Sequence, residues 1–153
     1  MESRPGTYIL LARCVSKHII RIGKIGTLRT QTGYYAYVGS AFGPGGVRAR
    51  LAHHTRVSHR RHWHMDYLRP VVQIEAAWCS FDPKQQEHQW AELCSRLPNS
   101  HAPLNGFGSS DCKCDTHLFF FSDAPSFELF RNLLSQATAG KINQIGRIPQ
   151  PAS

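Results

Sequence analysis

The stretch from Gly33 to His54, GYYAYVGSAFGPGGVRARLAHH, limits the possible folds more than any other part of the chain. Its first part, Tyr34–Ala41, has the aromatic and β-branched content that is typical of a strand. After Gly46 the pattern becomes helical, because Val47 and Leu51 are four residues apart and form one apolar edge. The segment therefore predicts a strand that runs through a glycine-rich loop directly into a helix.

The rest of the chain alternates between strand and helix patterns. The predicted further strands are Thr7–Val15, His18–Ile25, Val71–Ser80 and His117–Ser122. The predicted further helices are His62–Leu68, Asp82–Leu97 with Asp82-Pro83 as its start, and Phe127–Gln136. These patterns predict an α+β fold, with a small, mainly antiparallel central sheet flanked by helices.

The short connections between the first strands and the length of the chain predict the strand order and the number of domains. The first three strands follow one another closely, with Gly26–Gly33 as a polar loop, and this favours a three-stranded antiparallel meander. A chain of 153 residues is long enough for one domain with its own core. We expect this single domain to cover residues 1–140 and a flexible C-terminal tail to cover residues 141–153.

The distribution of charge indicates a polyanionic partner. Between Ser3 and Met65 there are 11 Lys or Arg residues and no Asp or Glu, whereas the remainder holds 7 basic and 10 acidic residues. A cationic half of this kind is typical of proteins that bind nucleic acid. A generic basic surface is the alternative, and the complete absence of acidic residues over this stretch argues against it.

The number of cysteines and the length of the apolar runs indicate in which cellular compartment the protein resides. Five cysteines are an odd number and do not suggest a disulfide scaffold, so a reducing cytoplasm fits better. No apolar run is long enough to cross a membrane, and the N-terminus lacks the pattern of a cleaved signal peptide. We expect a cytoplasmic protein that does not associate with membranes.

Two strands and a helix bring together residues suited to phosphate chemistry. By the period of two, Tyr8 and Tyr37 project from the same side of the sheet. Arg50 and His54 lie one above the other on the helix and border its buried edge. Each tyrosine taken alone fits a half-buried strand aromatic equally well.

The glycine-rich loop and a later carboxylate extend this group. Free N–H groups at a helix start, together with the helix dipole, favour an anion, although the glycines from Gly43 to Gly46 also fit a simple turn. Glu87 shares a helical face with Trp90 and Cys94, so it is expected to point inward, where a carboxylate needs an arginine, a metal or a tyrosine as partner. A salt bridge or a partly exposed helix position is the structural alternative.

These residues resemble the motifs of the GIY-YIG nuclease superfamily. Gly6-Thr7-Tyr8 stands in place of its first motif, Tyr37-Val38-Gly39 matches its second, and Arg50-Leu51-Ala52-His53-His54 fits its helix pattern. Three longer motifs match a small, poorly characterised subfamily, and they stand at Gly33–Ala41, His62–Leu68 and Gly106–Cys112. An additional hairpin separates Tyr8 from Tyr37.

The resemblance implies a metal-dependent endonuclease that cleaves DNA, in repair or on a particular DNA structure. Glu87 would hold the metal, Mg²⁺ or Mn²⁺, and Arg50 would neutralise the phosphate. Tyr8 would orient or activate the attacking water, Tyr37 would complete the site, and His54 would accept a proton. Gly39 would be the structural glycine of the second motif.

The basic residues around the site predict contacts to nucleic acid, and two other functions remain possible beside DNA cleavage. We expect Arg48, Arg56, Arg60, Arg61 and His64 to contact the nucleic acid. Cleavage of RNA, or binding by a module that has lost catalysis, remain alternatives to DNA cleavage.

Two clusters also offer metal ligands. Cys112, Cys114 and His117 provide three ligands for zinc, with Cys79, Cys94 or His101 as a fourth. Their spacing is not that of a standard zinc site, so we interpret them as structural and expect no stoichiometric zinc. His59, His62 and His64 form the second cluster, which we interpret as substrate contacts or as packing around Trp63.

Overall fold

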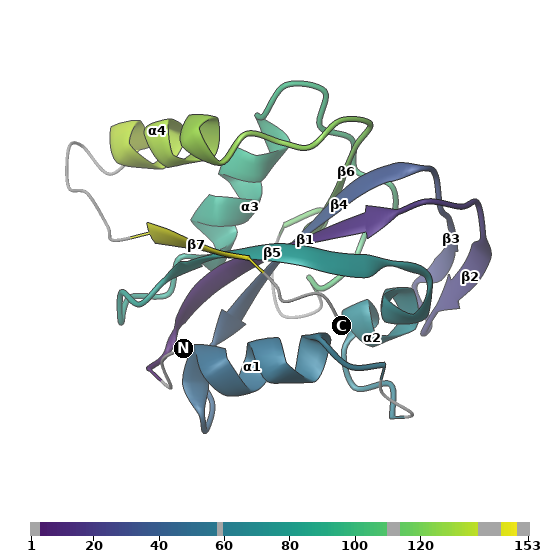
Figure 1. Cartoon of the computed structure of the whole chain (residues 1–153), viewed down its shortest axis with the longest axis horizontal. Helices are drawn as coiled ribbons and strands as arrows, with labels where there is room; N and C mark the ends of the chain where they lie inside the picture. Colours follow the sequence, from purple (N-terminus) through teal and green to yellow (C-terminus); the bar gives the residue numbers. More distant parts are fainter. Residues whose placement is uncertain (1–3, 58–59, 110–113, 138–144, 150–153) are drawn as a thin grey trace.

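The computed structural model describes residues 4–57, 60–109, 114–137 and 145–149 (Figure 1). The strands are β1 Gly6–Cys14, β2 Ile19–Ile22, β3 Gly26–Arg29, β4 Gly33–Ala41, β5 Gln73–Ser80, β6 Leu118–Phe121 and β7 Ile145–Pro149. The helices are α1 Gly46–His54, α2 His64–Leu68, α3 Glu87–Ser95, α4 Phe127–Ala137 and a 3-10 turn at Arg69–Val71. The predicted α+β class, with an antiparallel sheet and flanking helices, is confirmed.

The central sheet is built around β1. Strands β6, β4, β1 and β5 lie side by side in this order, all antiparallel, and β7 extends the sheet beyond β5. Tyr8 in the middle of the sheet pairs with Gly39 of β4 and with Cys79 of β5. This register places the first and second sequence motifs directly next to each other.

The predicted three-stranded meander is wrong, although the hairpin between Tyr8 and Tyr37 is present. Strands β2 and β3 pair only with each other, and β3 occupies part of the stretch that was expected to be a loop. The base of this hairpin is closed by two hydrogen bonds, from Thr30 N–H to His18 O at 2.8 Å and from His18 N–H to the Thr30 hydroxyl at 2.7 Å. Because β2 and β3 pair with each other, the chain returns to the central sheet after the hairpin, and β4 pairs with β1.

The sheet has two buried faces, as the alternation of side chains requires. Tyr8 and Tyr37 lie in the core on the face covered by α1 and α2. Ile9, Val38 and Trp78 lie in the core on the opposite face, which α3 and α4 cover (Figure 1). The two tyrosines of the motifs therefore face α1, the helix that carries Arg50 and His54.

Helix α3 begins later than predicted. The expected start at Asp82-Pro83 forms a turn, because the Asp82 carboxylate accepts the backbone N–H of Lys84 at 2.8 Å. The backbone N–H of Gln86 is bound to the Thr7 hydroxyl at 3.3 Å, and Gln86 is the N-cap. Glu87 is consequently the first residue of the helix and stands at its positive end.

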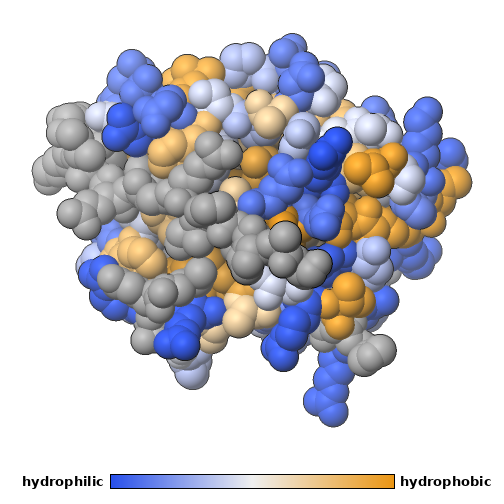
Figure 2. Space-filling view, in the orientation of Figure 1, coloured by the Kyte–Doolittle hydropathy of each residue, from blue (hydrophilic) through white to orange (hydrophobic). Residues whose placement is uncertain are grey.

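The C-terminal segment adds a strand to the edge of the sheet. Residues 145–149, within the segment that was expected to be a flexible tail, form β7 and satisfy the hydrogen-bonding groups along the outer edge of β5. Figure 2 shows hydrophilic side chains over much of one face, with hydrophobic patches between them. Val15, before the hairpin, and Ile19, the first residue of β2, are both 68% exposed. Among the described residues, none of the helices has the length and hydrophobicity that crossing a membrane requires.

Candidate active site

Tyr8 and Tyr37 lie side by side beneath α1, as the strand period predicts. Their ring centroids are 6.4 Å apart, and both side chains are buried. Gly39 stands opposite Tyr8 in the register of β1 and β4. A Cβ atom at position 39 would lie 2.5 Å from the Tyr8 hydroxyl oxygen, so this position requires glycine for lack of space.

His54, in the last turn of α1, contacts both tyrosines. Its Nε2 atom lies 3.0 Å from the Tyr8 hydroxyl oxygen, and its ring centroid is 5.9 Å from that of each tyrosine. Burial, and to a smaller extent the neighbouring His53, lowers the pKa of His54 to about 3. The imidazole is therefore neutral at neutral pH.

The phenol of Tyr8 is also uncharged at neutral pH. Burial and the nearby Tyr37 raise the pKa of Tyr8 well above its usual value, while Arg50 lowers it in part. Burial and the Glu87 carboxylate likewise raise the pKa of Tyr37, again opposed by Arg50. A positive charge close to these phenols is thus the one influence that favours their ionisation.

Arg50 supplies that positive charge at the edge of an open pocket. The pocket has a volume of about 270 Å³, and Arg50, His53 and Trp63 line it together with the glycine-rich loop. The guanidinium carbon of Arg50 lies 4.1 Å from the centroid of the Trp63 ring, a cation–π contact that holds the side chain in place. The pocket is therefore a cationic recess next to two buried tyrosines.

The start of α1 offers fewer free N–H groups than the sequence suggested. The Gly46 N–H is bound to the Gly43 carbonyl at 3.2 Å, and the Val47 N–H to the Arg4 carbonyl at 3.0 Å. Gly45 and Gly46 have φ values of +83° and +60°, so these glycines serve the turn. Arg50 is the arginine that lines this pocket and offers it a positive charge.

Glu87 approaches the same group from the other side of β4. Its Oε1 atom accepts a hydrogen bond from the Ser40 hydroxyl at 2.6 Å, and its Oε2 atom lies 3.1 Å from His117 Nδ1. Burial alone would raise the pKa of Glu87, but His117 and Ser40 outweigh it and hold this pKa below its usual value. Glu87 is therefore ionised, and its side chain keeps 23% exposure.

The structure thus brings together all five residues that the sequence singled out for catalysis. Tyr8, Tyr37 and His54 are in direct contact, and Arg50 and Glu87 act on the tyrosines electrostatically from opposite sides. Their catalytic roles stay predictions.

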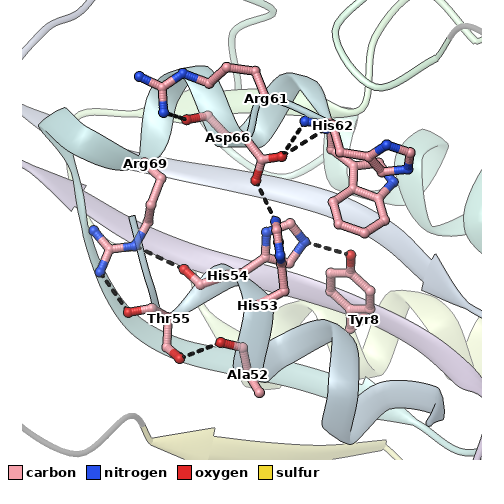
Figure 3. A network of polar contacts seen from close by, with 10 residues as sticks. Tyr8, Ala52, His53, His54, Thr55, Arg61, His62, Asp66 and Arg69 are labelled. Carbon is pink, nitrogen blue, oxygen red and sulfur yellow. Dashed lines mark hydrogen bonds and ion pairs between the residues drawn. The ribbon is translucent and has the colours of Figure 1, made fainter. Parts of the chain in front are cut away.

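Sequence reasoning missed the buried carboxylate Asp66, which organises the neighbouring network (Figure 3). Asp66 accepts the His53 Nε2–H at 2.7 Å and the backbone N–H groups of His62 and Trp63 at 2.8 and 2.9 Å. Burial opposes its ionisation, but these bonds prevail and lower the pKa of Asp66. Its position three residues after Trp63, as in a capping box, was the available signal.

The residues predicted to contact nucleic acid differ in exposure. Arg48, Arg56, Arg60 and Arg61 are exposed, on or directly after α1 and before α2. Arg61 also donates to the Asp66 carbonyl at 3.4 Å. His64 is half-buried, and its Nδ1 atom accepts the Gly108 N–H at 2.7 Å, so it holds the loop that contains Phe107.

The two sequence clusters of possible metal ligands are only partly assembled. His59 and Cys112 lie outside the described residues. His62 packs on Trp63 with ring centroids 4.3 Å apart, which fits the packing interpretation. Within the described ranges, Cys114 and His117 come together with His88, and not with Cys79, Cys94 or His101. Cys79 and Cys94 are instead buried in the cores on opposite faces of the sheet.

Comparison with known proteins places the chain in a family. No curated protein and no solved structure matches it. The family model for the domain of unknown function DUF123 matches residues 7–139, a span that holds every residue of the candidate site. The chain therefore belongs to the DUF123 family.

Proposed function

We propose that this protein is a metal-dependent endonuclease of the GIY-YIG type, which hydrolyses phosphodiester bonds in DNA. The observation that carries the proposal is the contact between Tyr8, Tyr37 and His54 next to an open pocket lined by Arg50. Buried phenols and a neutral imidazole beside a half-buried guanidinium that lines an open pocket form a site suited to an anionic substrate and to proton transfer.

Arg50 is the residue that binds the scissile phosphate. Its stacking on Trp63 fixes the guanidinium before the substrate arrives, so little conformational entropy is lost on binding. The positive charge then stabilises the extra negative charge that develops on phosphorus oxygens as water attacks.

Tyr8 and His54 handle the proton of the attacking water. As the water oxygen forms its bond to phosphorus, its proton passes to the Tyr8 oxygen, and the Tyr8 proton passes to His54 Nε2, 3.0 Å away. His54 is neutral and has a lone pair for this proton, although burial disfavours its charged form. The negative charge of the bound phosphate compensates for that cost. Tyr37 packs against both rings and keeps them aligned.

The residues around Glu87 fit a divalent cation bound through oxygen. Glu87 is ionised and partly exposed, and each of its carboxylate oxygens has only one partner among the described residues. Mg²⁺ is commonly held by one carboxylate together with water and substrate phosphate, which this arrangement permits. When bound, Mg²⁺ or Mn²⁺ would polarise the phosphate and favour departure of the leaving oxygen.

The basic half of the chain would bind the flanking nucleic acid. Arg48 is exposed on α1 and Arg56 is exposed just after it; both, together with Arg60 and Arg61, lie close in sequence to the Arg50 pocket. Contacts of this type are made to phosphates and are independent of sequence.

The test is a cleavage assay on a panel of substrates. Single-stranded, duplex and branched DNA, and RNA, are incubated with the purified protein in the presence of Mg²⁺, Mn²⁺ or EDTA. We expect cleavage of at least one DNA substrate with a divalent cation and none with EDTA. Cleavage of RNA alone would support the alternative of an RNA nuclease. Binding to DNA without cleavage under any condition would contradict catalysis and support a binding module.

A further inference from the structure

A second group of side chains with metal-binding atoms adjoins Glu87, because it includes His117, whose Nδ1 atom lies 3.1 Å from Glu87 Oε2. The ligand atoms of His88, Cys114 and His117 are all within 4.8 Å of one another. His88 comes from the first turn of α3, whereas Cys114 and His117 come from the segment that leads into β6. The mechanism proposed above does not use any of the three.

His117 has the features of a metal ligand that lacks its metal. The side chain is fully buried, yet neither ring nitrogen has a hydrogen-bond partner among the described residues. Its Nδ1 atom lies 3.1 Å from Glu87 Oε2, at ion-pair distance but not aligned for a hydrogen bond. The Nε2 atom has no such contact, and a buried ring nitrogen without a partner is costly, so in a native structure it indicates something that satisfies it.

The spacing of the other two ligands fits one tetrahedral ion. Zinc binds sulfur at about 2.3 Å and nitrogen at about 2.0–2.1 Å, so two such ligands around a tetrahedral ion lie about 3.6 Å apart. The His88 Nδ1 and Cys114 Sγ atoms are 3.5 Å apart. His88 is exposed and Cys114 is half-buried, so the group is open to solvent and its ligands can move the short distance required.

The chemistry of the ligands selects the kind of metal. One thiolate and two imidazoles favour Zn²⁺ over Mg²⁺, which prefers oxygen ligands. With His117 Nδ1 facing Glu87, the remaining nitrogen, Nε2, is left for the metal. A carboxylate that accepts the other ring N–H of a metal-bound histidine is a common supporting contact, and Glu87 Oε2 lies within reach of it, 3.1 Å from Nδ1.

We propose that His88, Cys114 and His117 bind one Zn²⁺ ion, with a water molecule or a further ligand in the fourth position. Binding releases the Cys114 thiol proton to solvent, and both imidazoles bind in their neutral form. The ion joins the start of α3 to the segment before β6 and orients Glu87 through His117. This arrangement in space replaces the expectation, based on sequence spacing, that no zinc is bound.

The experiment measures metal directly and does not depend on nuclease activity. The full chain is purified without added chelator, and its zinc content is determined by elemental analysis. The metal is then replaced by Co²⁺, whose thiolate charge-transfer absorption reports a Co–S bond. We expect one zinc per chain and this absorption in the wild type, and loss of both in Cys114→Ser and in His88→Ala.

Two controls make the outcome decisive. His101→Gln changes an exposed histidine outside the cluster and should retain the zinc. His88→Ala changes an exposed side chain, so far-ultraviolet circular dichroism should show that its fold is kept even where Cys114→Ser unfolds. A wild type that binds neither Zn²⁺ nor Co²⁺ would overturn the proposal. A folded His88→Ala variant that retains a full equivalent of zinc would do the same.

Discussion

The ring of Tyr8 on β1 occupies the space that a side chain at position 39 of β4 would need. The two residues are paired in the register of the strands, and the Tyr8 Cζ atom lies 2.6 Å from where a Cβ atom of residue 39 would stand. The hydroxyl group of Tyr8 is hydrogen-bonded to His54, and its ring packs against Tyr37. Any atom added at position 39 must therefore displace the ring on which the candidate site is built.

We predict that Gly39→Ala destabilises the protein by about 1–3 kcal/mol, as overpacking of a filled core does. It should also reduce cleavage by more than the loss of folded protein explains, because Tyr8 is displaced. Urea unfolding and a cleavage assay measure the two effects. Gly43→Ala is the matched control for stability, because a Cβ atom there meets nothing within 4 Å. Equal stability of the two variants would contradict the packing argument.

The buried His54 should make stability depend on pH. Its pKa is about 3 in the folded protein, against an ordinary value of 6.5, so only the unfolded chain gains this proton as the pH falls below 6.5. The free energy of unfolding should therefore decrease on acidification, by up to about 1.4 kcal/mol per pH unit.

The comparison of wild type with His54→Gln isolates this effect. Urea unfolding between pH 6.5 and 5 keeps the measurement above the range in which Asp66 and Glu87, whose pKa values are lowered, take up protons. We expect the dependence on pH to be weaker in the variant. An identical slope in both proteins would show that His54 is not held neutral by burial.

Parts of the site could be predicted from sequence because they depend on local periodicity. A period of two places Tyr8 and Tyr37 on the same face of adjacent strands, and a spacing of four places Arg50 above His54 on one helix. The alternation within a strand and the spacing within a helix hold wherever these elements form, whereas the meeting of Tyr8 with Tyr37 also requires that β1 pairs with β4. The inward direction of Glu87 followed from the helical period in the same way.

Other parts could not be predicted because they depend on distant segments. Glu87 meets Ser40, 47 residues away, only because α3 packs across β4. The N–H of Val47 is bound to the Arg4 carbonyl, so a contact between distant chain segments takes up one of the groups that an anion at the start of α1 would need. The hairpin was misread as part of a meander because strand patterns indicate strands but not their partners.

Nucleic-acid binding should depend strongly on salt. Arg56 and Arg60 are exposed and lie in the half of the chain without acidic residues. Their replacement by Ala together should weaken binding to all sequences and reduce the slope of log K against log salt by about 2, because each phosphate contact contributes about 1. Arg96→Ala with Arg131→Ala removes the same charge from the C-cap of α3 and from α4 and should change the slope little. Fluorescence anisotropy at several salt concentrations measures the slope for each double variant. Equal slopes for the two variants would contradict the assignment of Arg56 and Arg60 as phosphate contacts.

Arg50 should act mainly on the chemical step. Arg50→Ala removes the cation from the pocket and should lower kcat by about 10³-fold, which corresponds to about 4 kcal/mol in the barrier. Arg48→Ala, at an exposed position on the same helix, should raise KM modestly and leave kcat nearly unchanged. Steady-state kinetics on the cleaved substrate distinguish the two. An effect of Arg50→Ala confined to KM would mean that Arg50 only binds the substrate.

Glu87 and Glu92 lie on the same helix and offer the sharpest comparison. Glu92 is exposed and paired with Arg96, whereas Glu87 is partly buried and contacts Ser40 and His117. Glu87→Gln keeps the shape of the side chain but removes the charge that would hold Mg²⁺, so it should abolish cleavage. Glu92→Gln should have nearly wild-type activity.

Binding must be measured beside cleavage for this comparison to be decisive. Removal of a negative charge near a polyanion should leave affinity for DNA unchanged or slightly increase it. A Glu87→Gln variant that binds DNA normally in anisotropy but does not cleave it, with Glu92→Gln active on the same substrate, is the expected pattern. Full activity of Glu87→Gln, or equal loss in both variants, would mean that Glu87 does not hold the catalytic metal.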